Sequence, residues 1–242
     1  MTEALYLNNA YQKTAIGKVV GRVGTHGIIL DQSIFYATSG GQPGDNGWLN
    51  CNGKSIEIET TRKGELDAIV LHVKNGDSQD VLPQVGDIVE QRINWANRHA
   101  HMRMHTALHL LSVIIPLPVT GGAISAYKGR LDFNMPDAPQ DKTILTIQLN
   151  EIIKQDFKIT ASWVNDEELD ANPSLVKTMS VQPPRGTGRI RLIRIGSQKE
   201  EIDLQPCGGT HVSKTSEIGY VRISKIEKKG KQNRRFNLLF EK

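Results

Sequence analysis

The first ninety residues carry the pattern of short strands joined by tight turns. Residues 56–59 alternate apolar and charged side chains, which is the period of a half-buried strand. The run 68–73 is rich in β-forming residues and ends at the turn signal Asn75-Gly76-Asp77. Glycines recur at short intervals between Gly17 and Gly86, a spacing typical of small antiparallel barrels. This part of the chain is therefore predicted to be all-β and barrel-like.

The pattern changes near Asn94, where a helix is predicted from Trp95 to about Ile115. Apolar residues spaced by 4, 3 and 4 positions fall on one face of that helix and predict its buried side. Histidines spaced by 4 and 4 form a second stripe on the same helix. The apolar face consists of Met104, Leu108, Leu111 and Ile115, and the histidine stripe of His101, His105 and His109.

The remaining residues mix helix and strand patterns. A second helix is predicted over 142–154, with Asp141 as its N-cap. Alternation predicts a strand over 157–163, and a short acidic helix follows at 165–171. Further strands are predicted at about 189–195, 218–226 and 234–241. The predicted fold class is therefore α+β: a barrel-like domain over 1–92, then an α+β domain over 93–242 with an antiparallel sheet and a metal-binding helix.

Composition narrows the class of protein without identifying it. Apolar residues make up 38% and charged residues 23%, which is ordinary for a soluble globular chain. The net charge of +4 is compatible with a polyanionic partner. With only two cysteines, a disulfide framework is not expected. The first residues lack a basic segment followed by an apolar run, and no stretch is long enough to cross a membrane, so we expect a cytoplasmic protein.

Two short motifs offer metal ligands. His105 and His109 lie four residues apart on the predicted helix, so their imidazoles project from one face. Cys207 and His211 flank a Gly-Gly turn that lets a thiolate and an imidazole converge. Three nitrogens and one sulfur suit zinc, provided that the fold brings the motifs together. His101 and His105 have the same spacing, so geometry along the helix leaves open which pair binds.

Four segments of the chain resemble one known family. Residues 98–111 are similar to the signature helix of alanyl-tRNA editing domains, and residues 207–212 to their second signature. Residues 35–47 resemble the glycine-rich motif of their N-terminal β domain, and residues 129–133 also match. The family contains the editing domain of alanyl-tRNA synthetase and the free-standing AlaX proteins. The chain resembles the medium-length free-standing type.

This resemblance implies a zinc-dependent hydrolase acting on tRNA(Ala) that carries a wrong amino acid, with serine as the main substrate and glycine as a second. Carried over by position, the Zn²⁺ ligands are His105, His109, Cys207 and His211, which leaves His101 outside the set. Leu108 stands where many members have threonine, and Ala37-Thr38 replaces a proline-acid pair of some members. These departures bear on which aminoacyl group is accepted.

The other candidate residues each have a structural alternative. Thr106 could orient water or substrate, or bond the carbonyl one turn earlier. The segment Ser39, Gly40, Gly41 and Gln42 could line the substrate pocket, or only form a hairpin turn. RNA contacts are expected from Arg98, Arg103, Arg130 and Arg185, although charged residues usually form a solvated face.

Two rival functions remain at this level. One is a zinc-stabilised RNA-binding module without hydrolysis, and the other is a metallohydrolase acting on a small ester or amide. The oligomeric state is not predicted.

Overall fold

The computed structural model describes residues 2–74, 82–137, 141–177, 179 and 188–241. The chain divides into two compact units, Met1–Ala100 and His101–Lys242. The strands are mostly antiparallel and the helices few, which confirms the predicted α+β class. The domain limits drawn from the sequence, 1–92 and 93–242, stay a prediction. In the described part of the chain, no helix is long and apolar enough to cross a membrane.

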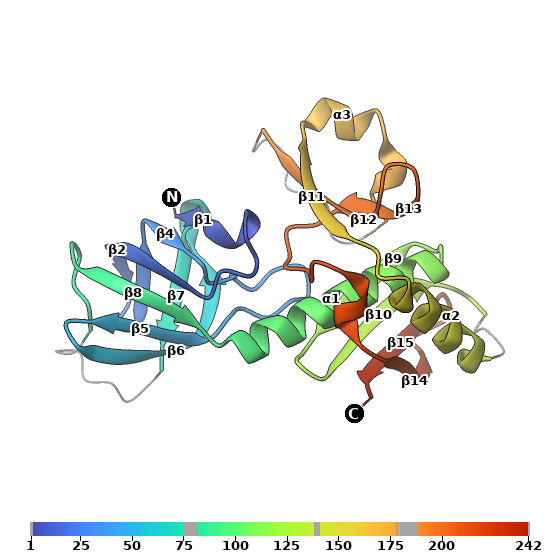
Figure 1. The fold of residues 1–242 in the computed structure, drawn as a ribbon, viewed down its shortest axis with the longest axis horizontal. Helices are drawn as coiled ribbons and strands as arrows, with labels where there is room; N and C mark the ends of the chain where they lie inside the picture. The colour runs from blue at the N-terminus through green and yellow to red at the C-terminus, as the bar shows by residue number, and fades with distance from the viewer. Residues whose placement is uncertain (1, 75–81, 138–140, 178, 180–187, 242) are drawn as a thin grey trace. The chain divides into compact units, whose positions relative to one another are not determined.

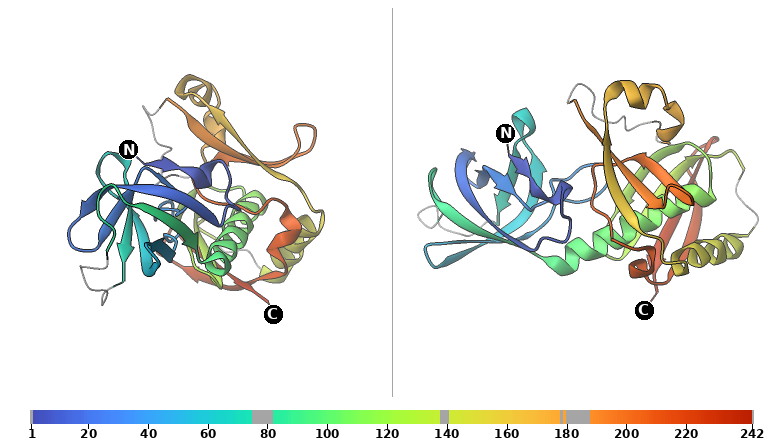
Figure 2. Two further views of the ribbon diagram at one scale, coloured as in Figure 1. Left: turned by 60° about the vertical axis from the view of Figure 1, so that its left-hand side comes forward. Right: turned by 45° about the horizontal axis from the view of Figure 1, so that its top comes forward.

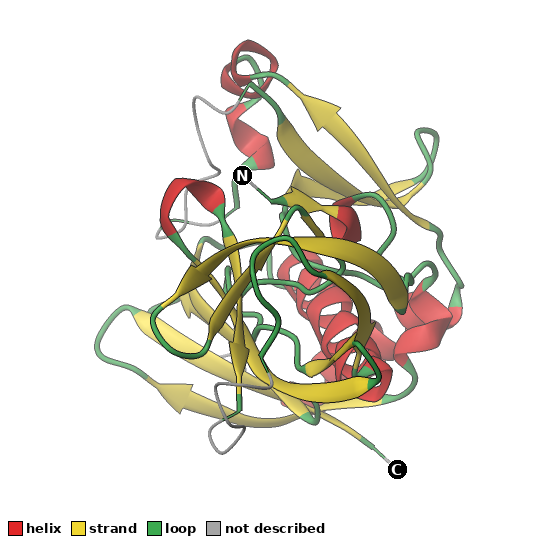
Figure 3. Ribbon diagram, turned by 90° about the vertical axis from the view of Figure 1, so that its left-hand side faces the viewer, coloured by secondary structure: helices red, strands yellow, loops and turns green. Residues whose placement is uncertain are grey.

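The first unit is built around a closed six-stranded barrel, with every neighbouring pair antiparallel (Figure 1; Figure 3, strands in yellow). Closure leaves the sheet without free edges. Among the described residues of this unit, a parallel pair of very short strands and two short 3₁₀ helices accompany the barrel. The barrel order is β2 (Thr14–Val23), β3 (Gly27–Leu30), β7 (Ile69–Val73), β6 (Lys54–Lys63), β5 (Gly47–Cys51) and β8 (Ile88–Ile93); the additional elements are β1 (Glu3–Ala4), β4 (Gln32–Ser33), η1 (Leu5–Leu7) and η2 (Glu65–Asp67).

The barrel interior follows from the alternation seen in the sequence. In β6, Ile56 and Ile58 are fully buried while Glu57 and Glu59 face solvent. Each of the other barrel strands also contributes buried aliphatic side chains, among them Val19, Ile28, Leu49, Leu71 and Val89. Burial of these side chains is the main stabilising contribution of the unit.

The second unit packs a long helix on a four-stranded antiparallel sheet. The sheet order is β14 (Val221–Lys228), β15 (Asn233–Phe240), β10 (Lys128–Asn134) and β9 (Val119–Ile124). The helix, α1 (Trp95–Ile114), begins in the first unit and continues in the second. A Cβ at Gly129 would lie 2.7 Å from the Met104 side chain, so this glycine permits the close approach of β10 to α1. The predicted apolar face of the helix is confirmed, because Met104, Leu108, Leu111 and Ile115 are all buried.

The second predicted helix is confirmed as α2 (Lys142–Lys154). Its predicted N-cap is also confirmed, since the Asp141 carboxylate accepts a hydrogen bond from Thr143 N at 2.7 Å. The helix packs on β14 through Asn150, whose amide donates to Val221 O at 2.7 Å and accepts from Val221 N at 3.1 Å.

A smaller antiparallel sheet consists of β11 (Ile159–Val164), β12 (Ile190–Gly196) and β13 (Glu201–Pro206) (Figure 2). The acidic helix is confirmed as α3 (Asp166–Asp170), and η4 (Pro173–Leu175) follows it. Two predicted strand starts were wrong. The strand expected from 157 begins at Ile159, and the strand expected from 218 begins at Val221 because η5 (Thr215–Ile218) comes first and Gly219, with φ 72°, ends it.

Candidate metal centre

The two predicted motifs meet in the second unit. His105 and His109 project from α1, and Cys207 and His211 come from the loop that follows β13. One potential ligand atom from each residue lies within 4.8 Å of the other three. Cys207 Sγ lies 3.5 Å from His105 Nε2 and 3.3 Å from His211 Nε2. Three imidazoles and a thiol therefore form a cluster that could hold one metal ion.

The ambiguity along the histidine stripe is reduced by the packing of the loop. Among the described residues, the converging ligand atoms belong to His105, His109, Cys207 and His211, and His101 is not part of that group. His101 lies one turn earlier on α1 and is 8% exposed. The imidazole rings of His105, His109 and His211 lie 4.3–5.2 Å apart, centroid to centroid.

The far nitrogens of two of these imidazoles are engaged away from the cluster. His109 Nδ1 lies 3.0 Å from Asp203 Oδ2. His211 Nδ1 lies 3.2 Å from Thr106 Oγ1, and the Thr106 hydroxyl donates to Met102 O at 2.9 Å. His109 Nδ1 also lies 3.0 Å from Gln205 Nε2. In a neutral imidazole, a ring proton on Nδ1 leaves Nε2 with a lone pair for a metal.

Burial and the close charges shift the pKa values of the cluster. Burial opposes ionisation of the Cys207 thiol, but the charges of His105 and His211 hold its pKa well below its usual value. Burial also opposes protonation of His109, yet its hydrogen bonds with Asp203 and Cys207 raise its pKa to about 9. Burial, followed by the charge of His105, lowers the pKa of His211 to about 3. The Cys207 thiolate and the neutral His211 imidazole have the form that binds a metal, whereas His109 must release a proton before it can bind one.

The loop that carries Cys207 is held by one glycine of the predicted Gly-Gly turn and by an arginine of β12. Gly209 N lies 3.4 Å from Cys207 Sγ and donates to it. Arg191, on β12, donates from Nη1 to Cys207 O at 3.1 Å and to Gly209 O at 2.8 Å. The missed partner Asp203 had a recognisable signal: positions 203, 205 and 207 share strand parity, so their side chains project to one side of β13 and its extension.

The other predicted site residues on α1 and in the glycine-rich segment have local hydrogen-bond partners. Thr106 is fully buried, and its hydrogen bond to Met102 O matches the structural alternative considered for it. Ser39 and Gln42, in the first unit, exchange backbone hydrogen bonds around Gly40 and Gly41, which have φ 55° and 83°. Two positive φ values are the signature of a tight hairpin turn. Contact of this segment with substrate stays a prediction.

The four candidate arginines have different surroundings. Arg98 is fully buried and pairs with Asp45, so no exposed atom is offered to RNA there. Arg103 donates to Ile218 O at 2.9 and 2.7 Å, and Arg130 pairs with Asp132 at 2.8 Å. Arg185 lies outside the described residues. RNA contact by Arg103, Arg130 and Arg185 stays a prediction.

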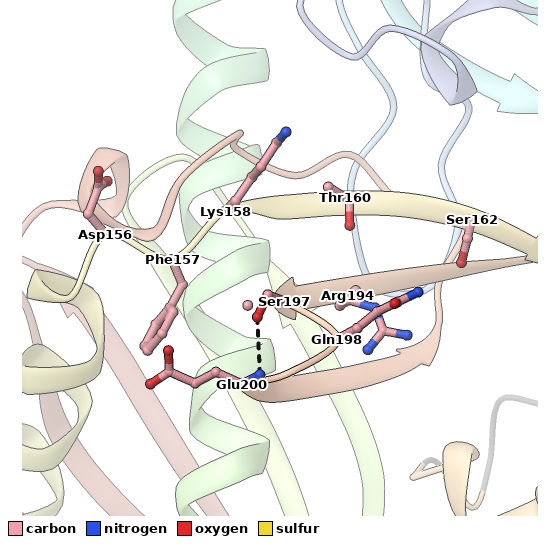
Figure 4. A pocket seen from close by; sticks show the side chains of 10 residues that line it. Asp156, Phe157, Lys158, Thr160, Ser162, Arg194, Ser197, Gln198 and Glu200 are labelled. Carbon is pink, nitrogen blue, oxygen red and sulfur yellow. Dashed lines mark hydrogen bonds between the residues drawn. The ribbon is translucent and has the colours of Figure 1, made fainter.

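A separate hollow of about 540 Å³ lies beside the small sheet and contains no member of the cluster (Figure 4). Side chains from β11 and from the β12–β13 turn line it, and the Ser197 hydroxyl accepts from Glu200 N at 3.1 Å. Its lining mixes both charges and includes Lys158, Thr160, Ser162, Arg194, Gln198 and Glu200.

The fold and the cluster define a two-unit α+β protein with a candidate metal centre built on a helix and a glycine-containing loop. Comparison with known families identifies residues 190–237 with the threonyl and alanyl tRNA synthetase second additional domain, and residues 5–97 with class II (A) tRNA synthetases. The chain belongs to the family of AlaX-M alanyl-tRNA editing proteins, as its similarity to curated members shows.

Relatives match over almost the full chain. The alanyl-tRNA editing protein AlaX-M of Saccharolobus solfataricus is 35% identical over 241 residues, which covers 97% of each chain. The AlaX-M protein of Methanosarcina mazei is 32% identical over 248 residues, covering 99% of this chain and 97% of its own. The alanine–tRNA ligase of Pyrobaculum calidifontis is 30% identical over 236 residues, or 94% of this chain and 25% of the ligase.

Proposed function

We propose that this protein hydrolyses the ester bond of tRNA(Ala) carrying a wrong amino acid, with serine as its main substrate and glycine as a second, and that it does so in the cytoplasm. Its full-length relatives are named alanyl-tRNA editing proteins, and it belongs to their family. The observation that carries the proposal is the convergence of ligand atoms from α1 and from the loop after β13.

The proposed resident metal is Zn²⁺, held by His105, His109, Cys207 and His211. The donor set supports this, because three imidazole nitrogens and one thiolate suit the tetrahedral preference of zinc. The orientation of the rings supports it as well, since the Nδ1 atoms of His109 and His211 have partners outside the cluster. When bound, zinc supplies Lewis-acid chemistry to a water or to the substrate ester.

Residues outside the cluster have separate proposed roles. We assign Thr106 to holding His211 through its hydroxyl, because that hydroxyl is buried and already bonded. Contact with the aminoacyl group by Ser39, Gly40, Gly41 and Gln42 remains part of the proposal. A polar group that binds the hydroxyl of a seryl ester has no partner when an alanyl ester is bound. Such a group therefore favours hydrolysis of Ser-tRNA(Ala) over Ala-tRNA(Ala).

The test compares Ser-, Gly- and Ala-tRNA(Ala) as substrates, with and without a zinc chelator. We expect release of serine and, more slowly, of glycine, while alanyl-tRNA is spared. The chelator and His109→Ala should each abolish release. The matched control is His101→Gln, which changes a histidine one helical turn outside the cluster and should keep both zinc and activity.

Two outcomes would contradict the proposal. If His109→Ala hydrolysed the ester at the full rate with no zinc bound, the proposed zinc site would be contradicted. Tight binding of Ser-tRNA(Ala) without release of serine would replace the hydrolase by an RNA-binding module.

A further inference from the structure

We infer that Asp203 is a positioning residue for the metal ligand His109, and that Lys177 holds Asp203 for this task. The inference rests on the proposed metal centre and concerns residues that do not themselves belong to the cluster. Both are far in sequence from the histidine that they serve: 94 positions separate His109 from Asp203, and 26 separate Lys177 from Asp203.

Asp203 lies on β13 with its side chain fully buried. Its Oδ2 atom lies 3.0 Å from His109 Nδ1 and accepts from Gln205 Nε2 at 2.7 Å. Its Oδ1 atom accepts from the Lys177 ammonium. Both carboxylate oxygens are thus satisfied, and a buried carboxylate without such partners would be costly.

The positive charge of Lys177 offsets the cost of burying the Asp203 carboxylate. The Lys177 side chain is 29% exposed, so its ammonium keeps part of its hydration while it contacts a carboxylate that has none. Gln205 adds a neutral donor from the same strand, and its Nε2 atom lies 2.7 Å from Asp203 Oδ2 and 3.0 Å from His109 Nδ1. Asp203 is therefore held from two sides, by donors other than the histidine.

The consequence for His109 is a fixed ring orientation and a fixed tautomer. An imidazole binds a metal through a nitrogen that carries no proton, so one nitrogen must hold the proton elsewhere. The Asp203 carboxylate accepts a charge-assisted hydrogen bond from His109 Nδ1–H, and this tautomer leaves Nε2 to bind the metal. His211 differs, because its Nδ1 faces the neutral hydroxyl of Thr106. The charged partner gives His109 the firmer support of the two.

The test measures zinc affinity in the full chain by competition with a chromophoric chelator. Asp203→Asn keeps the shape of the side chain but removes its charge, and we expect zinc binding to weaken by about 10- to 100-fold. Lys177→Met should weaken it by a smaller factor. The double variant should bind zinc with the same affinity as Asp203→Asn alone, because Lys177 acts through Asp203.

The control is Glu201→Gln, which also removes a carboxylate from β13 but one that is exposed and paired with Arg194. It should leave zinc affinity unchanged. A purely structural role for Asp203 predicts a lower melting temperature of the chelator-treated protein with the zinc dissociation constant unaltered, and that result would overturn the inference. The visible spectrum of the Co²⁺-substituted protein is a second readout, because a changed imidazole orientation shifts its ligand-field bands while the thiolate band remains.

The outcomes separate this inference from the proposed function. If the unmodified chain takes up no zinc, the proposed metal centre fails. If it binds zinc and both Asp203→Asn and Lys177→Met bind equally well, only the positioning role fails. Should Asp203→Asn not fold, Lys177→Met still tests the same network through a partly exposed side chain.

Discussion

The buried ion pair of the first unit allows a sharp test of stability. Asp45 and Arg98 are both essentially inaccessible to solvent, with side chains 2% and 0% exposed. Arg98 Nε lies 3.1 and 3.0 Å from the two Asp45 oxygens, and the guanidinium also donates to Ala10 O at 2.9 Å and Ile34 O at 2.6 Å. Asp45 Oδ2 in turn accepts from Tyr36 N at 2.7 Å. Loss of Asp45 therefore leaves the buried guanidinium with carbonyl acceptors but without its counter-charge, and it removes the carboxylate that accepts from Tyr36 N.

We expect Asp45→Ala to destabilise the first unit by about 3–5 kcal/mol, the range for breaking a buried ion pair on one side only. The unpaired Tyr36 N–H falls within that figure rather than adding to it, because the same carboxylate serves both donors. With a urea slope of about 2 kcal/mol/M, the unfolding midpoint should fall by about 2 M.

Tryptophan fluorescence can follow the first unit alone. Trp48 and Trp95 lie in that unit and Trp163 lies in the second, so the background variant Trp163→Phe removes the second signal. The matched control is Glu59→Ala, which deletes an exposed carboxylate of β6 and should change stability by no more than about 0.5 kcal/mol.

A double variant tests the physical reason. Asp45→Leu with Arg98→Met removes both charges, so it should be less destabilised than Asp45→Ala. The reasoning is refuted if Asp45→Ala loses less than about 1 kcal/mol, a loss too small for an uncompensated buried charge. A double variant as unstable as the single one would also refute it.

Three further perturbations follow from the packing. Gly44→Ala would put a Cβ 1.9 Å from Thr61 O and should cost about 1–3 kcal/mol in urea unfolding, whereas Gly21→Ala meets only Ile29 at 3.6 Å and should be tolerated. Asn150→Ala leaves both backbone groups of Val221 unpaired and should lower stability by about 2–3 kcal/mol in thermal melts; an unchanged melt would contradict the role of this contact between α2 and β14. Burial opposes ionisation of Asp132, but Arg235 and Arg130 hold its pKa below 3.8, so its contribution is present above about pH 4 and is lost as pH falls through the lower folded pKa. Asp132→Asn should therefore be less stable than the unmodified protein near pH 7, and a difference that persists undiminished at acid pH would argue against this origin.

Local periodicity in the sequence predicted the helices α1, α2 and α3, several strands and the residue types of the site, but it did not single out β9, β10 or β13. The spacing of Met104, Leu108, Leu111 and Ile115 predicted the buried face of α1, and Asp141 predicted the start of α2. These features depend on neighbours within a turn or two, so the sequence carries them directly. Strand starts were less accurate, because η5 and Gly219 before β14 have no counterpart in simple alternation.

Partners that are distant in the chain were decided by tertiary packing. Arg98 was a candidate for RNA contact, yet the fold places it on Asp45, 53 residues away. Asp203 and Lys177 were not predicted as site residues from the sequence. The folded chain brings the Asp203 carboxylate of β13 to His109 of α1, and the Lys177 ammonium to the same carboxylate.

The sequence by itself determined which residues could bind a metal, because two histidines four apart on a helix and a Cys-Gly-Gly-Thr-His turn are local patterns. Only the tertiary structure decided that the two patterns meet, that His101 stays outside the group, and which buried partners orient the rings. The physical reason is range. Backbone periodicity acts over a few residues. Burial and charge pairing instead depend on contacts between segments that lie about a hundred residues apart in the sequence, and these contacts form only when the chain folds.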